Sequence, residues 1–586
     1  MEVNLTPIIK ESFLQFGGAV LQSRALPDAR DLMKPSARQI FYCLYTDKFV
    51  HEKPFQKTLK AIGSCFRMYI HGDSSAEGII MRAGQPFAMR YPLVDVEGSY
   101  GTLLASGSWS APRYCLTGDA LVSTDKGLIK IEDIVKSEEN SDNEIPTLTC
   151  RGAFGLTTTN LIFNSGLQQT YKLTLKNGIQ ISGTPNHPIL TLNDKFEFVW
   201  KTIDELNVGD KILLNVRNNF LYGEENDIEY AKALGCLISE GCLSIENKID
   251  MINSDLDMIM PVQNLLQKYG SKAIYHRRNQ KDNCYEINTS NQMLYKRLKE
   301  DNCTYDSYHK HIPNSVFRGT KEYQKEFIRY LFEGDGCISI HSNRYGTIAY
   351  SSVSEDLIRE LQILLLSNFG IVSFIGRQKK RNEIKLEIGG EDAYLFCKNI
   401  GFVSKRKKEK AEQTIKFYEE SRNKKSTGSR GWRVFPEIRD YLMNYHPEAK
   451  LIISRKDRPN ECKGPLMSKD GLKILKEKLP YEAYSKIEFI YRNFVSIPII
   501  QKEDSGLQVV YSPKINEDCN SFTANGIINH NTAARLSALA NYLFADIQKD
   551  TIEEWRDNYD NTEQYPMVLP SKGFFNLVNG SYGIGK

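Results

Sequence analysis

The sequence lacks long hydrophobic runs, a secretory leader and any strong excess of one charge. No apolar stretch approaches the roughly 18–20 residues that a membrane helix needs, and the N-terminal MEVNLTPIIK has no basic region followed by an apolar one. We therefore expect a cytoplasmic protein with no membrane partner. The 76 Lys and Arg residues nearly balance the 72 Asp and Glu residues, so the net charge of +4 excludes a uniformly basic coat protein but permits local basic patches.

The 12 cysteines include no C-x-x-C pair, which argues against a zinc site or a disulfide framework. We expect most of them to be small core residues. With 41% hydrophobic and 11% aromatic residues, the chain has enough apolar side chains for several cores. Its 586 residues suggest about four domains.

The first 114 residues contain an ordered set of motifs. Apolar residues at helical spacing predict a helix over residues 8–21. It is followed by RALPDARDLMKPSARQIFY at 24–42, YIHGDSSAEGIIMRAGQPF at 69–87, LVDVEGSYG at 93–101 and SAPRY ending at Tyr114. In this order the motifs resemble the DNA-breakage region of type IIA topoisomerase A subunits, the class of DNA gyrase and topoisomerase IV. The resemblance implies an α+β region of winged-helix type.

The resemblance also implies a catalytic pair, Arg113 and Tyr114. A phenol oxygen can attack a phosphodiester and conserve the bond as a phosphotyrosine, while a guanidinium stabilises charge on the phosphoryl oxygens. By the same resemblance His71 supports catalysis, and Arg24 and Lys34 contact DNA near the scissile phosphate.

The family pattern breaks after Tyr114 and continues at Thr532 with TAARLSALANYLFADI, so two flanks of 169 residues in total surround a 417-residue insert. Ile584 matches the residue that wedges between bases in the family. The pattern stops at Lys586 where the family continues, so we expect an incomplete A subunit. The resemblance implies double-stranded DNA as substrate, an A-subunit homodimer, and a B subunit that binds ATP and supplies the Mg²⁺ site of the topoisomerase.

Reactive residue types stand at both ends of the insert. Cys115 begins it, and TPNHPIL at 184–190 supplies Thr184 and His187. A thiol can attack the carbonyl that precedes it, while Thr and His side chains can polarise the amide and protonate its departing nitrogen. At the other end, His530 and Asn531 immediately precede Thr532.

These blocks resemble those of inteins, which implies protein splicing. In that mechanism Cys115 makes an N-to-S acyl shift, Thr532 accepts the N-terminal segment, Asn531 cyclises with help from His530, and an O-to-N shift restores a peptide bond. Two positions depart from the pattern: Ser512 and Asn520 stand where many inteins carry Asp and His.

An internal repeat lies inside the insert. ALGCLISEGCLSI at 233–245 and YLFEGDGCISI at 330–340 predict two helices, each ending in a carboxylate, Glu240 or Asp335. Gly235 and Gly334 favour close packing of the two helices. Paired carboxylates suit Mg²⁺, so both are candidate metal ligands as well as catalytic residues.

The repeat resembles the LAGLIDADG homing endonucleases that are often nested in inteins. The resemblance implies site-specific cleavage of double-stranded DNA over a saddle of strands. Lys281 and Lys380 are the candidates for the active-site lysine. The basic runs HRRNQK at 276–281, GRQKKR at 376–381 and KRKKEK at 405–410 are either phosphate contacts or ordinary solvated surface.

We therefore expect a multidomain chain. Residues 1–114 and 532–586 are the topoisomerase flanks, 115–215 and 491–531 form an all-β Hint splicing domain, 216–410 form the α+β endonuclease, and 411–490 form an accessory helical segment. An alternative is a splicing-inactive insert that acts mainly as a DNA-binding endonuclease between inert flanks.

Overall fold

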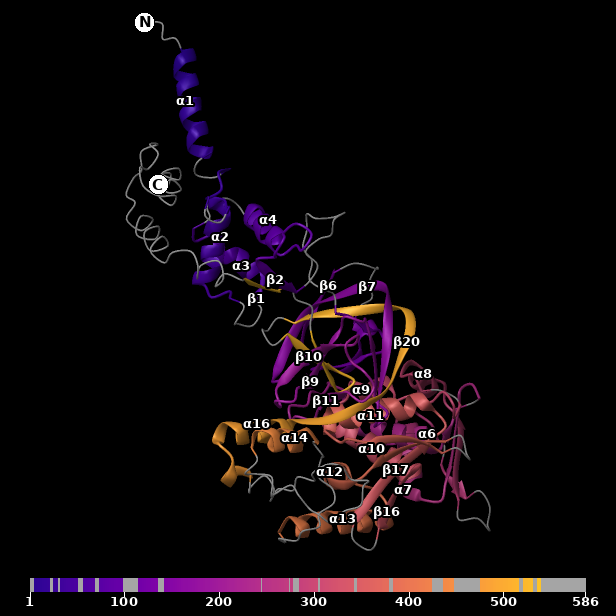
Figure 1. Ribbon diagram of the computed structural model, residues 1–586. Helices are drawn as coiled ribbons and strands as arrows, with labels where there is room; N and C mark the ends of the chain where they lie inside the picture. The colour runs from indigo at the N-terminus through magenta and orange to yellow at the C-terminus, as the bar shows by residue number, and fades with distance from the viewer. Residues whose placement is uncertain are drawn as a thin grey trace. The chain divides into compact units, whose positions relative to one another are not determined.

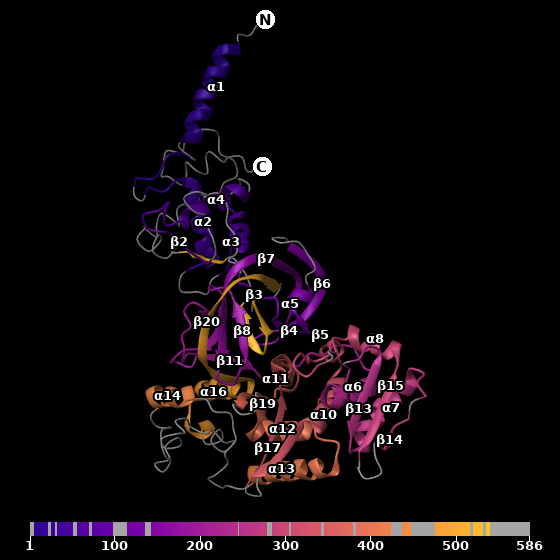
Figure 2. The same ribbon diagram turned by 90° about the vertical axis from the view of Figure 1, so that its right-hand side faces the viewer.

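The structure is a computed structural model, and Figures 1 and 2 show its elements. It describes residues 5–21, 25–29, 32–50, 56–68, 73–97, 114–134, 142–243, 245–272, 274–277, 284–303, 306–341, 345–378, 383–423, 436–446, 475–515, 520–530 and 535–538. The chain divides into two compact units, Met1–Pro112 with Thr532–Lys586, and Arg113–Asn531. None of the helices in the described ranges is long and apolar enough to cross a membrane.

The first unit combines residues from both sides of the insert. Its central strand β23 (Arg535–Ala538) pairs antiparallel with β1 (Gln56–Lys57) and β2 (Val94–Glu97), so the two flanks share one sheet. The helix expected over residues 8–21 is α1. The helices are α1 (Leu5–Val20), α2 (Pro35–Thr46), α3 (Thr58–Cys65) and α4 (Asp73–Ala83), and the core includes Ile40, Leu44, Ile62, Ile80 and Val94.

The second unit contains a β-domain, which we define as residues 114–215 with 494–530. Strand β20 (Phe494–Ile515) runs antiparallel to β7 (Leu156–Leu175) along most of its length, as Figure 1 shows. The other elements are β3 (Leu116–Thr117), β4 (Leu121–Thr124), β5 (Gly127–Lys130), α5 (Ile131–Ile134), β6 (Asp142–Arg151), β8 (Gln180–Gly183), β9 (Pro188–Leu192), β10 (Phe198–Thr202), β11 (Lys211–Asn215), β21 (Ser521–Ala524) and β22 (Ile527–His530).

The sheet of the β-domain closes on itself. Its order is β10-β9-β22-β11-β20-β3-β8-β7-β6-β4-β21, β5 pairs with β4, and β21 also pairs with β22. The closure interleaves strands from the beginning and the end of the insert. As a result, both ends of the insert belong to one closed sheet.

The second part of this unit is a repeat domain, residues 225–423. Its two halves have the same strand order, β12-β13-β15-β14 and β16-β17-β19-β18. The internal repeat predicted from the sequence is therefore present in the fold. The first half contains α6 (Ile228–Glu240), β12 (Gly241–Cys242), β13 (Lys248–Asn253), α7 (Leu256–Lys268), β14 (His276–Arg277), β15 (Tyr285–Ser290) and α8 (Gln292–Glu300). The second half contains α10 (Lys321–Gly334), β16 (Gly336–His341), β17 (Tyr345–Ser352), α11 (Glu355–Phe369), β18 (Phe374–Gln378), β19 (Glu383–Ile388) and α12 (Gly390–Asn399), with α9 (Asn314–Phe317) between the halves.

Side-chain caps define where the long helices begin. Asp227 accepts a hydrogen bond from the amide of Tyr230 at the start of α6, and Thr320 does the same for Tyr323 at the start of α10. The C-terminus of α11 is set by Gly370, whose left-handed backbone (φ 64°) a residue with a Cβ rarely adopts.

The expected accessory segment 411–490 is divided between the two domains. Helix α13 (Lys405–Asn423) crosses the expected boundary at residue 410, and its Ala411 belongs to the core of the repeat domain. Helices α14 (Pro436–Tyr445) and α16 (Tyr481–Asn493) instead bury Ile438 and Ile487 against the β-domain. The sequence does not show which part of the β-domain these two helices pack against.

Candidate functional site

Two clusters of polar residues lie in the second unit. We call the first the junction site, made of Tyr114, Cys115, Thr184, His187 and His530. The second is the paired-carboxylate site, made of Glu240, Asp335, Lys310 and Lys407. The junction site uses strands of the β-domain, and the paired-carboxylate site uses helices and loops of the repeat domain.

Cys115 is fully buried directly before β3. Thr184 forms hydrogen bonds with both its amide and its carbonyl. The Cys115 amide donates to Thr184 Oγ1 at 3.3 Å, and the Thr184 amide donates to the Cys115 carbonyl at 3.0 Å. Thr184 opens the turn between β8 and β9, so pairing of β8 with β3 brings the turn to the junction. The predicted Thr184 therefore lies beside the Tyr114–Cys115 peptide bond.

His187, in the same turn, is fully buried and its imidazole is held by Asn529. Its Nε2 lies 3.0 Å from Asn529 Oδ1. Burial lowers the pKa of His187 to about 4, while hydrogen bonds to the Asn529 side chain and to the Tyr114 backbone act in the opposite direction. At neutral pH the imidazole is therefore uncharged, and it lies beside the Tyr114 backbone.

His530 reaches the junction site from the other end of the insert. It ends β22 opposite Ser521, and its ring lies edge-on to the rings of Tyr114 and Trp200, with centroid distances of 5.7 and 4.7 Å. The side chain is almost fully buried. The β-domain thus brings the residue before Cys115 into contact with the residue before Asn531.

Two neighbours of the junction site were missed from the sequence. The Ser165 hydroxyl lies 3.3 Å from Cys115 Sγ, and Asn529 holds His187 as described above. Ser165 is in the middle of β7, where no sequence motif marks it. Asn529 could have been suspected from its position two residues before the end of the insert.

The paired-carboxylate site is built where α6 and α10 end side by side. A Cβ on Gly334 would lie 2.4 Å from Ser239 Oγ, and one on Gly235 would lie 2.6 Å from the Phe327 carbonyl oxygen. Only glycine permits this approach, so the predicted role of Gly235 and Gly334 in close packing is confirmed. The packing places Glu240 at the end of one helix and Asp335 directly after the other.

Both carboxyls have raised pKa values. Burial is the largest cause for Glu240, whose pKa Lys310 and Lys407 lower in part. Asp335 is an exposed residue. Desolvation of its carboxyl is the first cause that raises its pKa, to about 6; Glu240 adds to this, and Lys310 and Lys407 oppose it. The two acids therefore interact electrostatically with the two lysines, and Lys407 also forms an ion pair with the buried Glu333 at 3.5 Å.

The sequence interpretation missed Lys310, and it considered Lys407 only as part of the basic run 405–410. Lys310 donates to the Ile238 and Ser239 carbonyls at the end of α6, at 2.6 and 3.3 Å. Lys407 donates to the Phe332 and Gly336 carbonyls at the end of α10, at 3.0 and 2.8 Å. A cation that satisfies the last carbonyls of a helix also complements its dipole. The interpretation of the run 405–410 as phosphate contacts is wrong for Lys407, which is buried.

Several predicted residues lie outside the described ranges. They are Arg24, His71, Arg113, Lys281, Lys380, Asn531, Thr532 and Ile584. Lys34 is described, and it is an exposed residue that precedes α2. No group of three or more His, Cys, Asp or Glu side chains suited to a metal ion occurs within the described residues. Glu240 and Asp335 remain as two hard oxygen donors, a set that fits Mg²⁺ only if substrate or water completes it.

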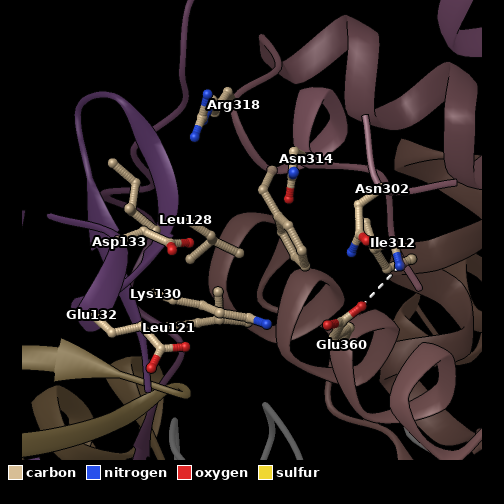
Figure 3. Close-up of a pocket in the computed structure, with 12 residues that line it drawn as sticks. Leu121, Leu128, Lys130, Glu132, Asp133, Asn302, Ile312, Asn314, Arg318 and Glu360 are labelled. Atoms are coloured by element: carbon tan, nitrogen blue, oxygen red, sulfur yellow. Dashed lines mark hydrogen bonds between the residues drawn. The ribbon is translucent and has the colours of Figure 1, made fainter. Parts of the chain in front are cut away.

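A cavity of about 230 Å³ lies between the β-domain and the repeat domain (Figure 3). Lys130 and Asp133 border it from the β-domain, and Asn302, Asn314 and Glu360 border it from the repeat domain. It is separate from the junction site, none of whose residues lines it. It adjoins the loop that carries Lys310.

Comparison with known proteins places both parts of the chain. Residues 24–145 match the family of DNA gyrase/topoisomerase IV A subunits, and residues 322–401 match the LAGLIDADG-like domain. The DNA gyrase A subunit of Mycobacterium leprae is 28% identical over 99% of this chain, which spans about half (46%) of that protein. The protein of the same name from Mycolicibacterium flavescens is 29% identical over 91% of this chain and 96% of its own length.

Among solved structures, the chain is similar to I-DmoI in complex with DNA and Mn, with 16% identity and a TM-score of 0.24 over 30% of this chain and 96% of that chain. The N-terminal LAGLIDADG domain of WhiA has 18% identity and a TM-score of 0.23 over 32% and 87%. The two family matches show that the chain combines a region similar to DNA gyrase/topoisomerase IV A subunits with a LAGLIDADG-like domain.

Proposed function

We propose that the chain is a topoisomerase A-subunit precursor whose insert, residues 115–531, is an intein that removes itself by protein splicing. One observation carries this proposal. Tyr114 and Cys115 at one end of the insert meet His530 at the other end, inside one closed sheet with Thr184 and His187. Splicing needs both ends at one place, because proximity makes acyl transfer intramolecular. The β-domain would then be the Hint splicing domain.

The first step is attack of Cys115 Sγ on the Tyr114 carbonyl carbon. The Tyr114–Cys115 amide bond breaks, a thioester forms, and the Cys115 nitrogen takes up a proton. Thr184 binds the amide that becomes this amine. The His187 imidazole, neutral and beside the Tyr114 backbone, can take the thiol proton and return it to the nitrogen.

The later steps use the other end of the insert. The Thr532 hydroxyl attacks the thioester and releases the Cys115 thiol. The Asn531 side-chain nitrogen then attacks its own main-chain carbonyl carbon, which breaks the Asn531–Thr532 bond. His530, which lies against Trp200 and opposite Ser521, would donate a proton to the departing nitrogen. Attack of that amine on the ester joins Tyr114 to Thr532 by a peptide bond.

The spliced product carries Arg113 and Tyr114 as the pair for DNA breakage, with His71, Arg24, Lys34 and Ile584 as supporting DNA contacts. Tyr114 is the residue at the splice junction, and in the precursor its ring lies edge-on to that of His530. The remaining parts of the proposal are an A-subunit homodimer and a B subunit that binds ATP and the topoisomerase Mg²⁺.

We also propose that the repeat domain is a homing endonuclease for double-stranded DNA. Glu240 and Asp335 would hold Mg²⁺, which when bound supplies Lewis-acid activation of a phosphodiester. Lys310 and Lys407 keep the two carboxyls more ionised than burial alone allows. The strands that follow α6 and α10 would lie along DNA.

Mass spectrometry of the expressed chain tests the splicing proposal. A free 417-residue insert together with a 169-residue ligated product is the expected result. An intact 67.0 kDa chain would favour the alternative, in which the insert acts mainly as a DNA-binding endonuclease between inert flanks.

A further inference from the structure

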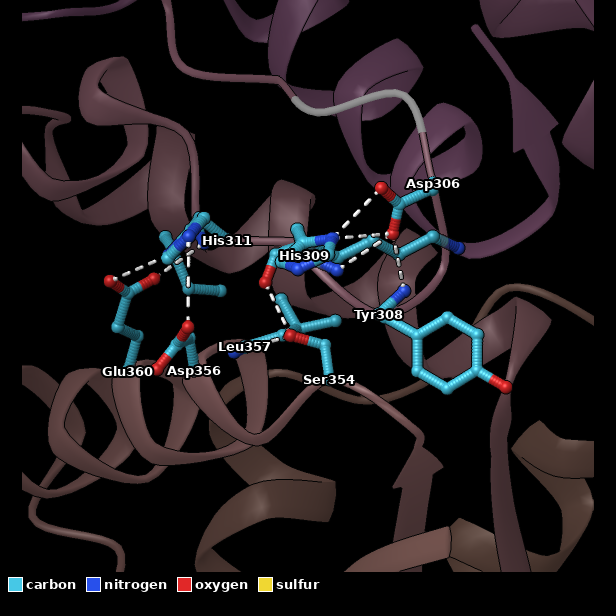
Figure 4. A network of polar contacts seen from close by, with 10 residues as sticks. Asp306, Tyr308, His309, His311, Ser354, Asp356, Leu357 and Glu360 are labelled. Carbon is cyan, nitrogen blue, oxygen red and sulfur yellow. Dashed lines mark hydrogen bonds and ion pairs between the residues drawn. The ribbon is translucent and has the colours of Figure 1, made fainter. Parts of the chain in front are cut away.

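Three consecutive residues, Lys310, His311 and Ile312, are held by the first turns of α11 (Figure 4). The hydroxyl of Ser354, which caps α11, donates to the Lys310 carbonyl at 2.6 Å. The Ile312 amide donates to Glu360 Oε2 at 2.8 Å. Helix α11 belongs to the second half of the repeat domain, whereas Lys310 donates hydrogen bonds to the end of α6, in the first half.

The side chain between these two bonds is tied to the same helix. His311 Nδ1 lies 3.2 Å from Glu360 Oε1, and His311 Nε2 lies 3.8 Å from Asp356 Oδ2. The hydrogen bond to Glu360 is the main cause that raises the pKa of His311, against burial and the charge of Lys130. Glu360 therefore uses both carboxylate oxygens on this one segment.

The two lysines of the paired-carboxylate site are supported differently. Lys407 lies within α13, so its backbone is fixed by the hydrogen bonds of a helix. Lys310 lies between α8 and α9 in a connection without regular structure. The cavity of about 230 Å³ adjoins this connection at Asn302, Ile312 and Asn314 (Figure 3). The connection is therefore not packed against other residues on the side of the cavity.

Burying the carboxylate of Glu360 has a desolvation cost that a purely structural contact would not require. The residue is only 9% exposed, and a buried carboxylate is tolerated only when its oxygens are hydrogen-bonded. Apolar residues would hold a loop against a helix without this desolvation cost. A carboxylate acceptor instead fixes the direction of the Ile312 amide, and with it the register of the preceding Lys310.

We propose that Glu360, together with Ser354, is a positioning residue that holds the Lys310 ammonium against the end of α6, beside Glu240 and Asp335. Neither residue belongs to the paired-carboxylate site. Both act through the backbone of Lys310. The functional part of the inference rests on the proposed endonuclease activity, whereas the positioning itself does not.

Amine footprinting of the full chain tests the positioning. Acetic anhydride labels exposed lysines, and mass spectrometry gives the labelling rate of Lys310. We expect Glu360→Ala to increase that rate about tenfold, because the loop opens and the ammonium leaves the Ile238 and Ser239 carbonyls. Glu360→Gln keeps an acceptor for the Ile312 amide and should restore most of the protection. Ser354→Ala provides a second variant in case Glu360→Ala does not fold.

A matched control removes the same kind of bond elsewhere. Asp392 Oδ1 accepts from the Val372 amide at 2.9 Å, beyond the other end of α11. Asp392→Ala should cost similar thermal stability but leave the labelling of Lys310 unchanged. An unchanged Lys310 rate in both Glu360→Ala and Ser354→Ala, or an equal increase in Asp392→Ala, would overturn the inference.

Cleavage of a supercoiled plasmid that carries the uninterrupted coding sequence across the Tyr114–Thr532 junction measures the consequence in the presence of Mg²⁺. Glu360→Ala should lower kcat about 10- to 100-fold with an unchanged KM for DNA. Nicked circles should accumulate, because Lys407 still serves the other half. Equal slowing of both strands would overturn the assignment of this effect to Lys310. If the unmodified chain does not cut, the endonuclease proposal fails, and the footprint still decides whether Glu360 positions Lys310.

Discussion

The junction site and the paired-carboxylate site solve opposite electrostatic problems. Most residues of the junction site are buried, and desolvation keeps His187 unprotonated at neutral pH. The paired-carboxylate site concentrates two acids and two cations at the ends of two helices, where one acid is open to solvent. Peptide rearrangement needs water excluded, whereas cleavage of DNA needs a charged surface that a polyanion and a cation can reach. If the sites are independent, each can be removed without loss of the other.

The largest expected effect is the complete loss of splicing in Cys115→Ala. An alanine cannot form the thioester, so only the full-length precursor of 67.0 kDa should be detected by mass spectrometry. Cys115 is small and buried, and the replacement keeps the strand, so DNA cleavage by the same preparation should be unchanged. Ligated product from this variant would contradict the assigned mechanism.

The second effect is loss of DNA cleavage in Asp335→Asn, by about 10³-fold with Mg²⁺ present. The folded-state pKa of Asp335, about 6, lies above its ordinary value of 3.8, so the ionised carboxyl destabilises the folded state above that range. Removing the charge should therefore raise the melting temperature at pH 7 while splicing continues. A lower melting temperature would show that Asp335 is held by contacts beyond those described.

Residue chemistry made the junction site predictable from the sequence. Cys115, Thr184, His187 and His530 were identified because they stand in blocks that resemble those of inteins, and because acyl transfer demands a thiol and proton donors. Ser165 was not predictable. Its relation to Cys115 depends on how β7 lies beside β3 and β8, and any of its neighbours could have occupied that place.

Only the two carboxylates of the paired-carboxylate site, at the ends of its two helices, were predictable from the sequence. The repeat identified Glu240 and Asp335, because both follow a glycine-bearing apolar helix. The search for lysines favoured exposed basic runs. Lys310 lies outside every such run, and Lys407 lies within the run 405–410 but is buried; both ammonium groups bind carbonyls at helix ends. Those carbonyls are a property of the fold, and no local pattern reveals them.

The response to acid separates the two sites further. DNA cleavage should fall about tenfold per pH unit below pH 6 as Asp335 becomes protonated, and a pH–rate profile measures this. His187 should stay neutral down to nearly pH 4, which its NMR titration would report. The stability effects have opposite signs. The raised pKa of Asp335 makes its contribution to stability more favourable as the pH falls from 6 toward 4. The lowered pKa of His187 makes the fold less stable as the pH falls from 6.5 toward 4. Titration of His187 near pH 6.5 would show that it is solvated.

The smallest effect tests whether the sites are independent at all. Leu366, near the end of α11, belongs to the core of the β-domain although its helix belongs to the repeat domain. A Cβ on Gly526 would lie 2.2 Å from Leu366 Cδ2, so this leucine packs directly against the turn that precedes β22 and His530.

Leu366→Ala should therefore slow the cleavage after Asn531 by about three- to tenfold and cost about 3 kcal/mol of stability, with DNA cleavage little changed. Leu361→Ala is the matched control, because the same helix buries Leu361 in the core of the repeat domain. It should cost similar stability but leave splicing unaffected, as followed by gel densitometry of precursor and products over time. Equal effects of the two variants on splicing would mean that splicing is slowed by loss of stability in general, and not by loss of the contact between Leu366 and the turn before β22. A difference between them would show that the endonuclease helix is a working part of the splicing fold, and that the two sites share a scaffold although they share no chemistry.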